Sequence, residues 1–392
     1  MDTINADIER DIETSNEEIF EDIPPIEGER IVVYSRDWTI ETIFNQIELG
    51  NIDLNPKFQR RNAWKDDKKS RLIESFLLGL PVPQIVLAED KAKLKSFIVI
   101  DGKQRLITIA GFMDPIKYNY WKNNQLSNLK SRADLNGVSY QNFKTTERYS
   151  NEYRSFLNSD IRCTIISNYS SIDVLYDVFY RLNTGSVTLS TQELRQVLHK
   201  GPFADYLYEI TTELQPIHEV IGLTEPDPRL YDMEFLLRFI SLYFFGKEYK
   251  GNLKAFLDNS MGIITKSWDK YQNELRDLYT KINEAITKLH KVFGKKNVGK
   301  RYSKQKYTGF NKAIFEVQLF YFIQIPNKIM TLSRNKHFKA KFENLSTNDT
   351  EFNDTITAST KDVAKYRKRY DAIKNLVNEV YNLNLRNTIL RN

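Results

Sequence analysis

The sequence has few of the residues that build disulfides and metal sites. It contains a single cysteine, Cys163, which excludes an internal disulfide and a cysteine-rich zinc site. The histidines are scattered and show no ligand spacing, so a histidine-based metal site is not expected. They are His199, His218, His290 and His337.

Long apolar stretches are also missing. No segment approaches the roughly 20 apolar residues that cross a membrane, and the acidic N-terminus lacks the apolar part of a signal peptide. We therefore expect a cytoplasmic protein with no membrane partner. A Gly-x-x-x-x-Gly-Lys-Ser/Thr segment is absent as well, which excludes a Walker A phosphate loop.

Charge is unevenly distributed along the chain. Residues 1–30 contain 11 acidic residues and two basic residues, Arg10 and Arg30, which gives a net charge of −9. Because the whole chain has a net charge of +6, the other 362 residues carry +15. We interpret residues 1–30 as a flexible acidic arm. The basic remainder favours anionic partners such as nucleotides or DNA, although dispersed surface lysines would give the same total.

Hydrophobic periodicity divides the chain near residue 200. We expect an α+β domain with a small mixed sheet over residues 31–200 and an all-α helical domain over residues 201–392. Residues 114–156 are polar and are predicted to form an irregular insertion over the core. The expected strands are 52–54, 84–87, 96–100 and 161–166, and strand 96–100 is expected to be buried on both faces. Ser190 and Glu193 are expected to form a capping box for a helix that follows them. The other expected helices are 38–49, 68–78, 103–112, 172–182, 202–213, 230–245, 261–293, 311–325 and 363–383.

The first candidate site is the turn from Asp101 to Arg105. An apolar strand ends at Asp101, Gly102 permits a tight turn, and a helix follows. The free N–H groups at such a helix start attract anions, and Lys103 and Arg105 add positive charge that suits phosphate. Asp101 could hold a metal ion or orient water, and Gln104 could position water. An ordinary surface turn with solvated charges is the alternative.

Two further segments carry polar residues suited to a ligand. Residues 58–64 place Gln59 and Arg60 before a helix and end at Trp64, for which packing in the core is the favoured interpretation. Residues 181–185 form a predicted turn in which Asn183 could contact a ligand. A purely structural turn explains that segment equally well.

Residues 285–315 form a basic segment that contains no Asp or Glu. Lysine and arginine alternate there with Tyr302, Tyr307 and Phe310, a mixture that suits a phosphate backbone with stacked bases. A mobile lysine-rich loop over residues 294–309 is the alternative. The candidate DNA-binding residues are Lys295, Lys296, Lys300, Arg301, Lys304 and Lys306.

Taken in order, these motifs resemble the N-terminal (GmrS-like) domain of the GmrSD type IV restriction enzymes. The resemblance spans about residues 31–260 and departs from the family pattern at Lys103, where Gln is usual. The matching segments are Gly50–Arg60, Trp64, Leu72–Ser75, Gly79–Pro83, Asp101–Thr108, Arg181–Gly185, Leu189–Leu194 and Asp232–Arg238.

The resemblance implies a ParB/sulfiredoxin-like fold that binds a nucleoside triphosphate with Mg²⁺. It places Asp101, Gly102, Gln104, Arg105 and Thr108 in the nucleotide site. Gln59 and Arg60 would face that site, with Lys103 at its turn and Asn183 as a further candidate. Restriction members also carry a His-Asn-His nuclease, which we do not recognise in these 392 residues. A separate nuclease or effector protein is therefore an expected partner.

The sequence leaves three functions open. The leading hypothesis is a nucleotide-binding, NTP-hydrolysing sensor or regulator in a prokaryotic restriction or anti-phage defence system. The second is a non-catalytic, ParB-like DNA-binding adaptor, and the third is a protein-interaction or antitoxin-like module in which the acidic arm docks on a basic surface. A homo-oligomer is compatible with each.

Overall fold

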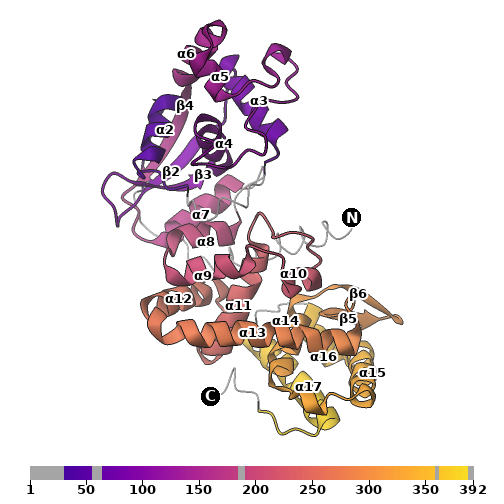
Figure 1. The fold of residues 1–392 in the computed structure, drawn as a ribbon. Helices are drawn as coiled ribbons and strands as arrows, with labels where there is room; N and C mark the ends of the chain where they lie inside the picture. The colour runs from indigo at the N-terminus through magenta and orange to yellow at the C-terminus, as the bar shows by residue number, and fades with distance from the viewer. Residues whose placement is uncertain (1–30, 55–63, 184–189, 358–361, 387–392) are drawn as a thin grey trace. The chain divides into compact units, whose positions relative to one another are not determined.

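The computed structural model describes residues 31–54, 64–183, 190–357 and 362–386 (Figure 1). These residues form two compact units, one over residues 31–198 and the other from residue 199 onward. The first unit contains a four-stranded sheet with helices, and the second contains helices and a two-stranded hairpin.

The sheet of the first unit has the strand order β1–β4–β2–β3. The central strands β2 and β4 run parallel, whereas β1 and β3 are antiparallel to their neighbours, so the predicted small mixed sheet is confirmed. The sequence did not reveal β1, because its mostly exposed residues lack the alternation of a half-buried strand. The strands are β1 (Val32–Thr39), β2 (Ile85–Glu89), β3 (Phe97–Asp101) and β4 (Asp160–Ser167).

Side chains of β3 alternate between two hydrophobic cores. Phe97 and Val99 enter one core, while Ile98 and Ile100 enter the core on the opposite face. All four side chains are buried, which confirms the prediction of a strand covered on both faces. The sheet is therefore the middle layer of this unit.

Helices cover both faces of this sheet (Figure 1). Five helices contribute to the larger core: α2 (Ile40–Glu48), α3 (Asp66–Leu77), α4 (Lys103–Met113), α5 (Tyr140–Thr145) and α6 (Ser150–Leu157). Two helices contribute to the smaller core: α7 (Ile172–Asn183) and α8 (Thr191–Leu198).

The structure corrects the prediction for residues 114–156. This segment contains α5 and α6 and supplies core residues, among them Trp121, Phe143 and Phe156, which are at most 1% exposed. The indole Nε1 of Trp121 also donates to the carbonyl of Thr108, at 3.2 Å. Polar turns separate these aromatic residues, so the segment shows no regular hydrophobic period despite being part of the core.

The second unit is mainly helical. It contains α9 (Pro202–Thr211), α10 (Pro216–Ile221), α11 (Tyr231–Phe245), α12 (Leu253–Lys266), α13 (Trp268–Phe293), α14 (Lys312–Gln324), α15 (Leu332–Asn348), α16 (Thr350–Thr357) and α17 (Val363–Tyr381). The predicted helix over 261–293 is wrong as a single element. Ser267 leaves helical geometry, with φ −115° and ψ 36°, and separates α12 from α13.

The prediction that this unit is all-α is also wrong. Strands β5 (Lys300–Ser303) and β6 (Lys306–Phe310) form an antiparallel hairpin in which Tyr302 pairs with Tyr307. Lysine-rich sequence has little intrinsic preference for strands, so residue propensities did not predict this hairpin. Within the described ranges, no helix combines the length and apolarity that crossing a bilayer requires.

Candidate functional site

The turn between β3 and α4 depends on Gly102. Its φ is +96°, in the left-handed region that side chains disfavour. A Cβ there would lie 2.9 Å from Cγ1 of Ile85 and 3.2 Å from the guanidinium Nη2 of Arg105. Glycine is thus required both for the backbone conformation and for the close approach of β2 and Arg105.

Helix α4 begins at this turn without a capping side chain. Gly102 is its N-cap and provides no side-chain acceptor, while its carbonyl accepts from the N–H of Leu106 at 3.0 Å. The N–H groups of the first helical turn have no acceptor within a helix. Together with the helix dipole, they make this end of α4 favourable for an anion.

Arg105 is held in place by two neighbours. Its Nη2 donates to Oδ2 of Asp101 at 2.7 Å and to the carbonyl of Gln84 at 2.8 Å. The side chain of Arg105 is 12% exposed and that of Asp101 is 33% exposed. Nε of Arg105 is buried and has no hydrogen-bond partner among the described residues, so the guanidinium retains unused donor capacity.

Lys103 faces an acidic residue from a distant helix. Its Nζ lies 3.9 Å from Oε1 of Glu193, and both side chains are nearly buried. Glu193 also accepts from the N–H of Ser190 at 2.7 Å, while its own N–H donates to Oγ of Ser190 at 3.1 Å. This confirms the predicted capping box of α8 and places the charge of that box beside the turn.

Gln104 carries the second unsatisfied atom of the site. Its side-chain Oε1 is buried and has no partner within the described part of the chain. Its backbone carbonyl accepts from the hydroxyl of Thr108 at 2.7 Å, and Thr108 is fully buried. The Thr108 hydroxyl is therefore engaged in supporting α4, whereas Gln104 keeps an acceptor that a water or ligand donor could satisfy.

Carboxylates at the turn are too few for an all-protein metal cage. No group of three or more His, Cys, Asp or Glu side chains among the described residues is arranged to hold a metal ion. Asp101 alone contributes a partly exposed carboxylate. This fits Mg²⁺, which proteins commonly bind through one or two carboxylates together with the phosphates of a substrate.

Some predicted site residues lie outside the described structure. Gln59 and Arg60 fall in the range 55–63, which the structure does not describe. Asn183 is the last residue of α7, and its side chain is likewise outside the description. The structure therefore brings together Asp101, Gly102 and the residues that follow them, and leaves the other parts of the predicted site as a sequence-based expectation.

Trp64 lies close to the start of α3. Its partly buried ring packs against the larger core of the first unit, and Nζ of Lys68 lies 4.4 Å from the ring centroid. This agrees with the interpretation of Trp64 as a packing residue.

The basic segment over residues 285–315 contains the end of α13, the β5–β6 hairpin and the start of α14. Lys295 pairs with Glu219 at 2.9 Å. The aromatic residues of the segment make contacts within the protein: the Tyr302 and Tyr307 ring centroids lie 5.0 Å apart, and Phe310 lies 5.6 Å from Phe315. These rings are therefore engaged in packing within the protein, which does not favour a role in stacking on bases.

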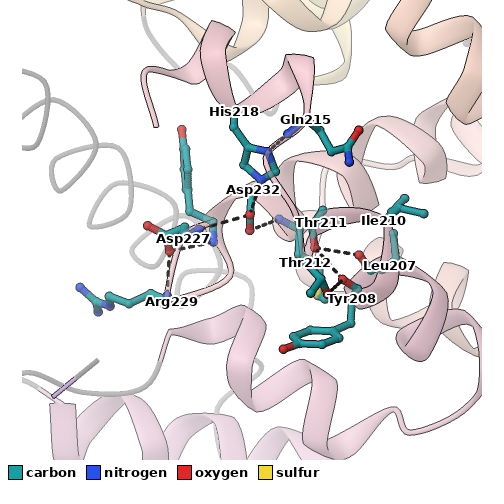
Figure 2. Close-up of polar contacts among 12 residues, drawn as sticks. Leu207, Tyr208, Ile210, Thr211, Thr212, Gln215, His218, Asp227, Arg229 and Asp232 are labelled. Atoms are coloured by element: carbon teal, nitrogen blue, oxygen red, sulfur yellow. Dashed lines mark hydrogen bonds and ion pairs between the residues drawn. The ribbon is translucent and has the colours of Figure 1, made fainter. Parts of the chain in front are cut away.

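The second unit contains a buried polar cluster that the sequence did not predict (Figure 2). Nε2 of His218 lies 2.7 Å from Oδ2 of Asp232, and Nδ1 of His218 accepts the N–H of Gln215 at 2.8 Å. His218 and Asp232 are both fully buried. The backbone N–H at Nδ1 fixes the neutral tautomer, with the proton on Nε2. The pair links α10 to the start of α11, and the burial of both side chains fits a structural role.

The segment Asp232–Arg238 at the start of α11 ends at Arg238, which belongs to another buried pair. Nε of Arg238 donates to Oε2 of Glu316 at 2.8 Å, and the hydroxyl of Tyr370 donates to Oε1 at 3.3 Å. Glu316 is fully buried. Asp232 and Arg238, which the sequence matched to a family motif, are thus structural links within the helical unit.

Sequence reasoning missed two residues of the Gly102 site. Gln84 supplies a carbonyl to Arg105, and Glu193 supplies the charge opposite Lys103. A backbone carbonyl has no sequence signature. The sequence predicted Glu193 only as a helix-capping residue. The one signal for an acidic neighbour was Lys103 itself, a charged residue at a turn beside a buried strand.

Comparison with known proteins gives a family match for most of the first unit. The model of the GmrSD restriction endonuclease N-terminal domain matches residues 40–200. That range includes the turn at Gly102 and Glu193, and it ends before the helical unit. Comparison with curated proteins and with solved structures gave no match.

Proposed function

We propose, from the match of residues 40–200 to the GmrSD restriction endonuclease N-terminal domain, that the chain is a nucleotide-binding regulator in a restriction or anti-phage defence system. The nucleotide's phosphates bind at the turn around Gly102. The cofactor is a nucleoside triphosphate with Mg²⁺, and the reaction that follows binding is hydrolysis of the terminal phosphate.

One observation carries this proposal. The uncapped start of α4 lies beside a guanidinium and an amide that each retain a buried, unsatisfied atom, Nε of Arg105 and Oε1 of Gln104. Unsatisfied buried polar atoms cost free energy on the order of 1–3 kcal/mol each and are few in native proteins. A phosphate oxygen would accept from Arg105 and from the free N–H groups at once.

Each residue at the turn has a distinct role in this proposal. Arg105 neutralises phosphate charge while Asp101 and the carbonyl of Gln84 hold its guanidinium in position. The side-chain Oε1 of Gln104 accepts a hydrogen bond from the attacking water and orients it. Water attacks the terminal phosphorus, the bond to the bridging oxygen breaks, and the products are a nucleoside diphosphate and phosphate. Bound Mg²⁺ would neutralise charge on the phosphate oxygens, with Asp101 as its protein ligand.

Calorimetric titration with ATP, GTP, CTP and UTP in the presence of Mg²⁺, followed by phosphate-release assays, tests the proposal. We expect at least one triphosphate to bind, and Arg105→Ala to weaken that binding by about tenfold or more, because a hydrogen bond to a charged group contributes about 1.5–3 kcal/mol. Wild-type protein that binds none of the four would refute the nucleotide site.

Two controls accompany Arg105→Ala. Arg71→Ala removes an exposed arginine from α3 and should leave nucleotide affinity unchanged. Arg105→Lys keeps the charge but loses the fork of donors that holds both Asp101 and a phosphate, so it should recover only part of the affinity. Unfolding in urea, measured for each variant, separates lost binding from lost folding.

A further inference from the structure

Basic residues dominate an extended part of the second unit. Residues 285–342 contain 14 lysines and arginines and one acidic residue, Glu316, a net charge of +13. Glu316 is fully buried and paired with Arg238. The exposed surface contributed by these residues therefore carries no acidic side chain. The charge is also separate from the family match, which ends at residue 200.

The β5–β6 hairpin packs on α15, whose first part also belongs to this basic stretch (Figure 1). The N–H of Tyr302 donates to Oγ of Ser346 at 3.0 Å, and the hydroxyl of Tyr307 donates to Oε1 of Glu343 at 2.9 Å. Lys339 of α15 lies with its Nζ 5.8 Å from the Tyr307 ring centroid. We define the hairpin surface as Lys296, Lys300, Arg301, Lys304, Lys306 and Lys336.

These cations have no acidic partner in the part of the chain that the structure describes. Among the described residues, none of the six lies within 4.0 Å of a carboxylate oxygen, and Lys296, Lys304, Lys306 and Lys336 are exposed. Neighbouring acids are already engaged: Glu219 pairs with Lys295, and Glu343 accepts from Tyr307 and lies 4.0 Å from Lys339. Solvated surface lysines usually alternate with acids, which this surface does not provide.

The tip of the hairpin is strained. Lys304 and Gln305 form a two-residue loop with φ values of +49° and +62°. A loop with positive φ at both positions is the type I′ geometry, which favours Asn-Gly because other side chains are strained there. Strain of this kind costs on the order of 1 kcal/mol or more per residue and clusters at functional sites. Here it keeps a lysine and a glutamine exposed at the end of the ribbon.

We propose that the hairpin surface binds double-stranded DNA, with the β5–β6 ribbon entering the major groove and the surrounding lysines contacting phosphates. The B-form major groove is about 12 Å wide and accepts a two-stranded ribbon. The aromatic rings of the hairpin pack against one another and against the helices, so they are not platforms for unstacked bases. This distinguishes the surface from a single-strand binding site.

The proposal does not rest on nucleotide binding, because the hairpin and the Gly102 turn belong to different units of the chain. Fluorescence anisotropy with a labelled duplex of about 25 base pairs, over a series of salt concentrations, measures it directly. The full-length protein should bind the duplex with an affinity that falls linearly in a plot of log K against log salt.

The decisive variant combines Lys296→Gln, Lys300→Gln, Lys304→Gln and Lys306→Gln. Each lost phosphate contact lowers the salt slope by about 0.9, so the slope should fall by up to about 4 and the affinity by on the order of tenfold or more near physiological salt. A matched control neutralises four exposed lysines elsewhere in the same unit, Lys247, Lys250, Lys266 and Lys270, and should retain the wild-type slope. Equal loss in both variants would show that only total charge matters and would overturn the site.

Three further measurements complete the test. Replacing the same four hairpin lysines with arginine keeps the charge and should retain binding. A-form RNA duplex of the same length should bind more weakly, because its major groove is too deep and narrow for side chains to read. Equal or tighter binding of RNA or of single-stranded DNA would overturn the groove assignment, and no binding of the wild type to duplex DNA would overturn the proposal as a whole while leaving the nucleotide site untouched.

Discussion

Two of the turns with left-handed backbone, at Gly102 and at the tip of the β5–β6 hairpin, reach that conformation with different residues. At the first, Gly102 takes φ +96° and the cations that follow are close to acids, Arg105 with Asp101 and Lys103 with Glu193. At the second, Lys304 and Gln305 take positive φ without glycine. No carboxylate within the described ranges pairs with Lys304.

The difference separates two uses of positive charge. Charge that is buried and paired, as at Gly102, has a fixed geometry and can orient a small anionic ligand. Charge that is exposed and unpaired, as on the hairpin, is free to follow a long anionic surface and confers affinity that depends on salt. The paired charges should therefore matter for stability, whereas the unpaired charges should matter for binding.

Breaking the most completely buried pair should have the largest effect on stability. Asp232→Leu removes the acceptor for Nε2–H of His218 and for the backbone N–H groups of Asp227 and Met233. We expect a loss of about 4 kcal/mol in the free energy of unfolding, because a buried polar group left without its partner is costly. The double variant Lys304→Gln/Lys306→Gln, measured by the same urea titration, should change stability by less than about 0.5 kcal/mol.

Gly102→Ala should give the next largest loss. The new Cβ meets Ile85 at 2.9 Å in addition to the strained φ, so we expect a loss of about 3 kcal/mol from strain and overpacking together. Gly79→Ala is the matched control, because Gly79 has φ +66° but nothing within 4 Å of a Cβ. It should lose only about 1 kcal/mol. Equal losses at both glycines would mean that the contact with Ile85 has no energetic weight.

Relieving the strained hairpin tip should move stability and binding in opposite directions. Lys304→Asn/Gln305→Gly supplies residues that accept positive φ at both positions. Thermal and urea unfolding should show a gain of about 1 kcal/mol. Affinity for duplex DNA should fall, because a cation is lost from the tip. A variant that gains both stability and DNA affinity would contradict the assignment of the strain to function.

Lys103→Gln should have the smallest effect on stability. It removes the charge that lies 3.9 Å from Glu193, a separation too long for a hydrogen bond. The ordinary hydrogen bonds of Glu193 to the start of α8 remain, so the free energy of unfolding should fall by less than about 1 kcal/mol. Nucleotide affinity, measured by calorimetry, should fall several-fold because one positive charge leaves the phosphate site. Unchanged affinity would show that Glu193 fully neutralises Lys103.

Particular residues show where sequence reasoning succeeded. The apolar run ending at Asp101, with glycine after it and a helical period beyond, predicted β3, the turn and α4, because each signal is local. The capping box of Ser190 and Glu193 was likewise evident from spacing alone. Strand β1 was missed because it depends on pairing with β4, more than 120 residues later in the chain.

The sequence by itself determined the Asp-Gly turn, the helix it starts, the excess of basic residues and the similarity of residues 40–200 to the GmrSD N-terminal domain. Those features follow from local backbone preference and from composition, which neighbouring residues are enough to define. The tertiary structure decided which charges are paired: it brought Glu193 to Lys103, buried Glu316 with Arg238, and folded residues 300–310 into a hairpin. The lysines of that hairpin have no carboxylate partner among the described residues. Pairing depends on distance in space, and residues far apart in the chain acquire that distance only through the fold.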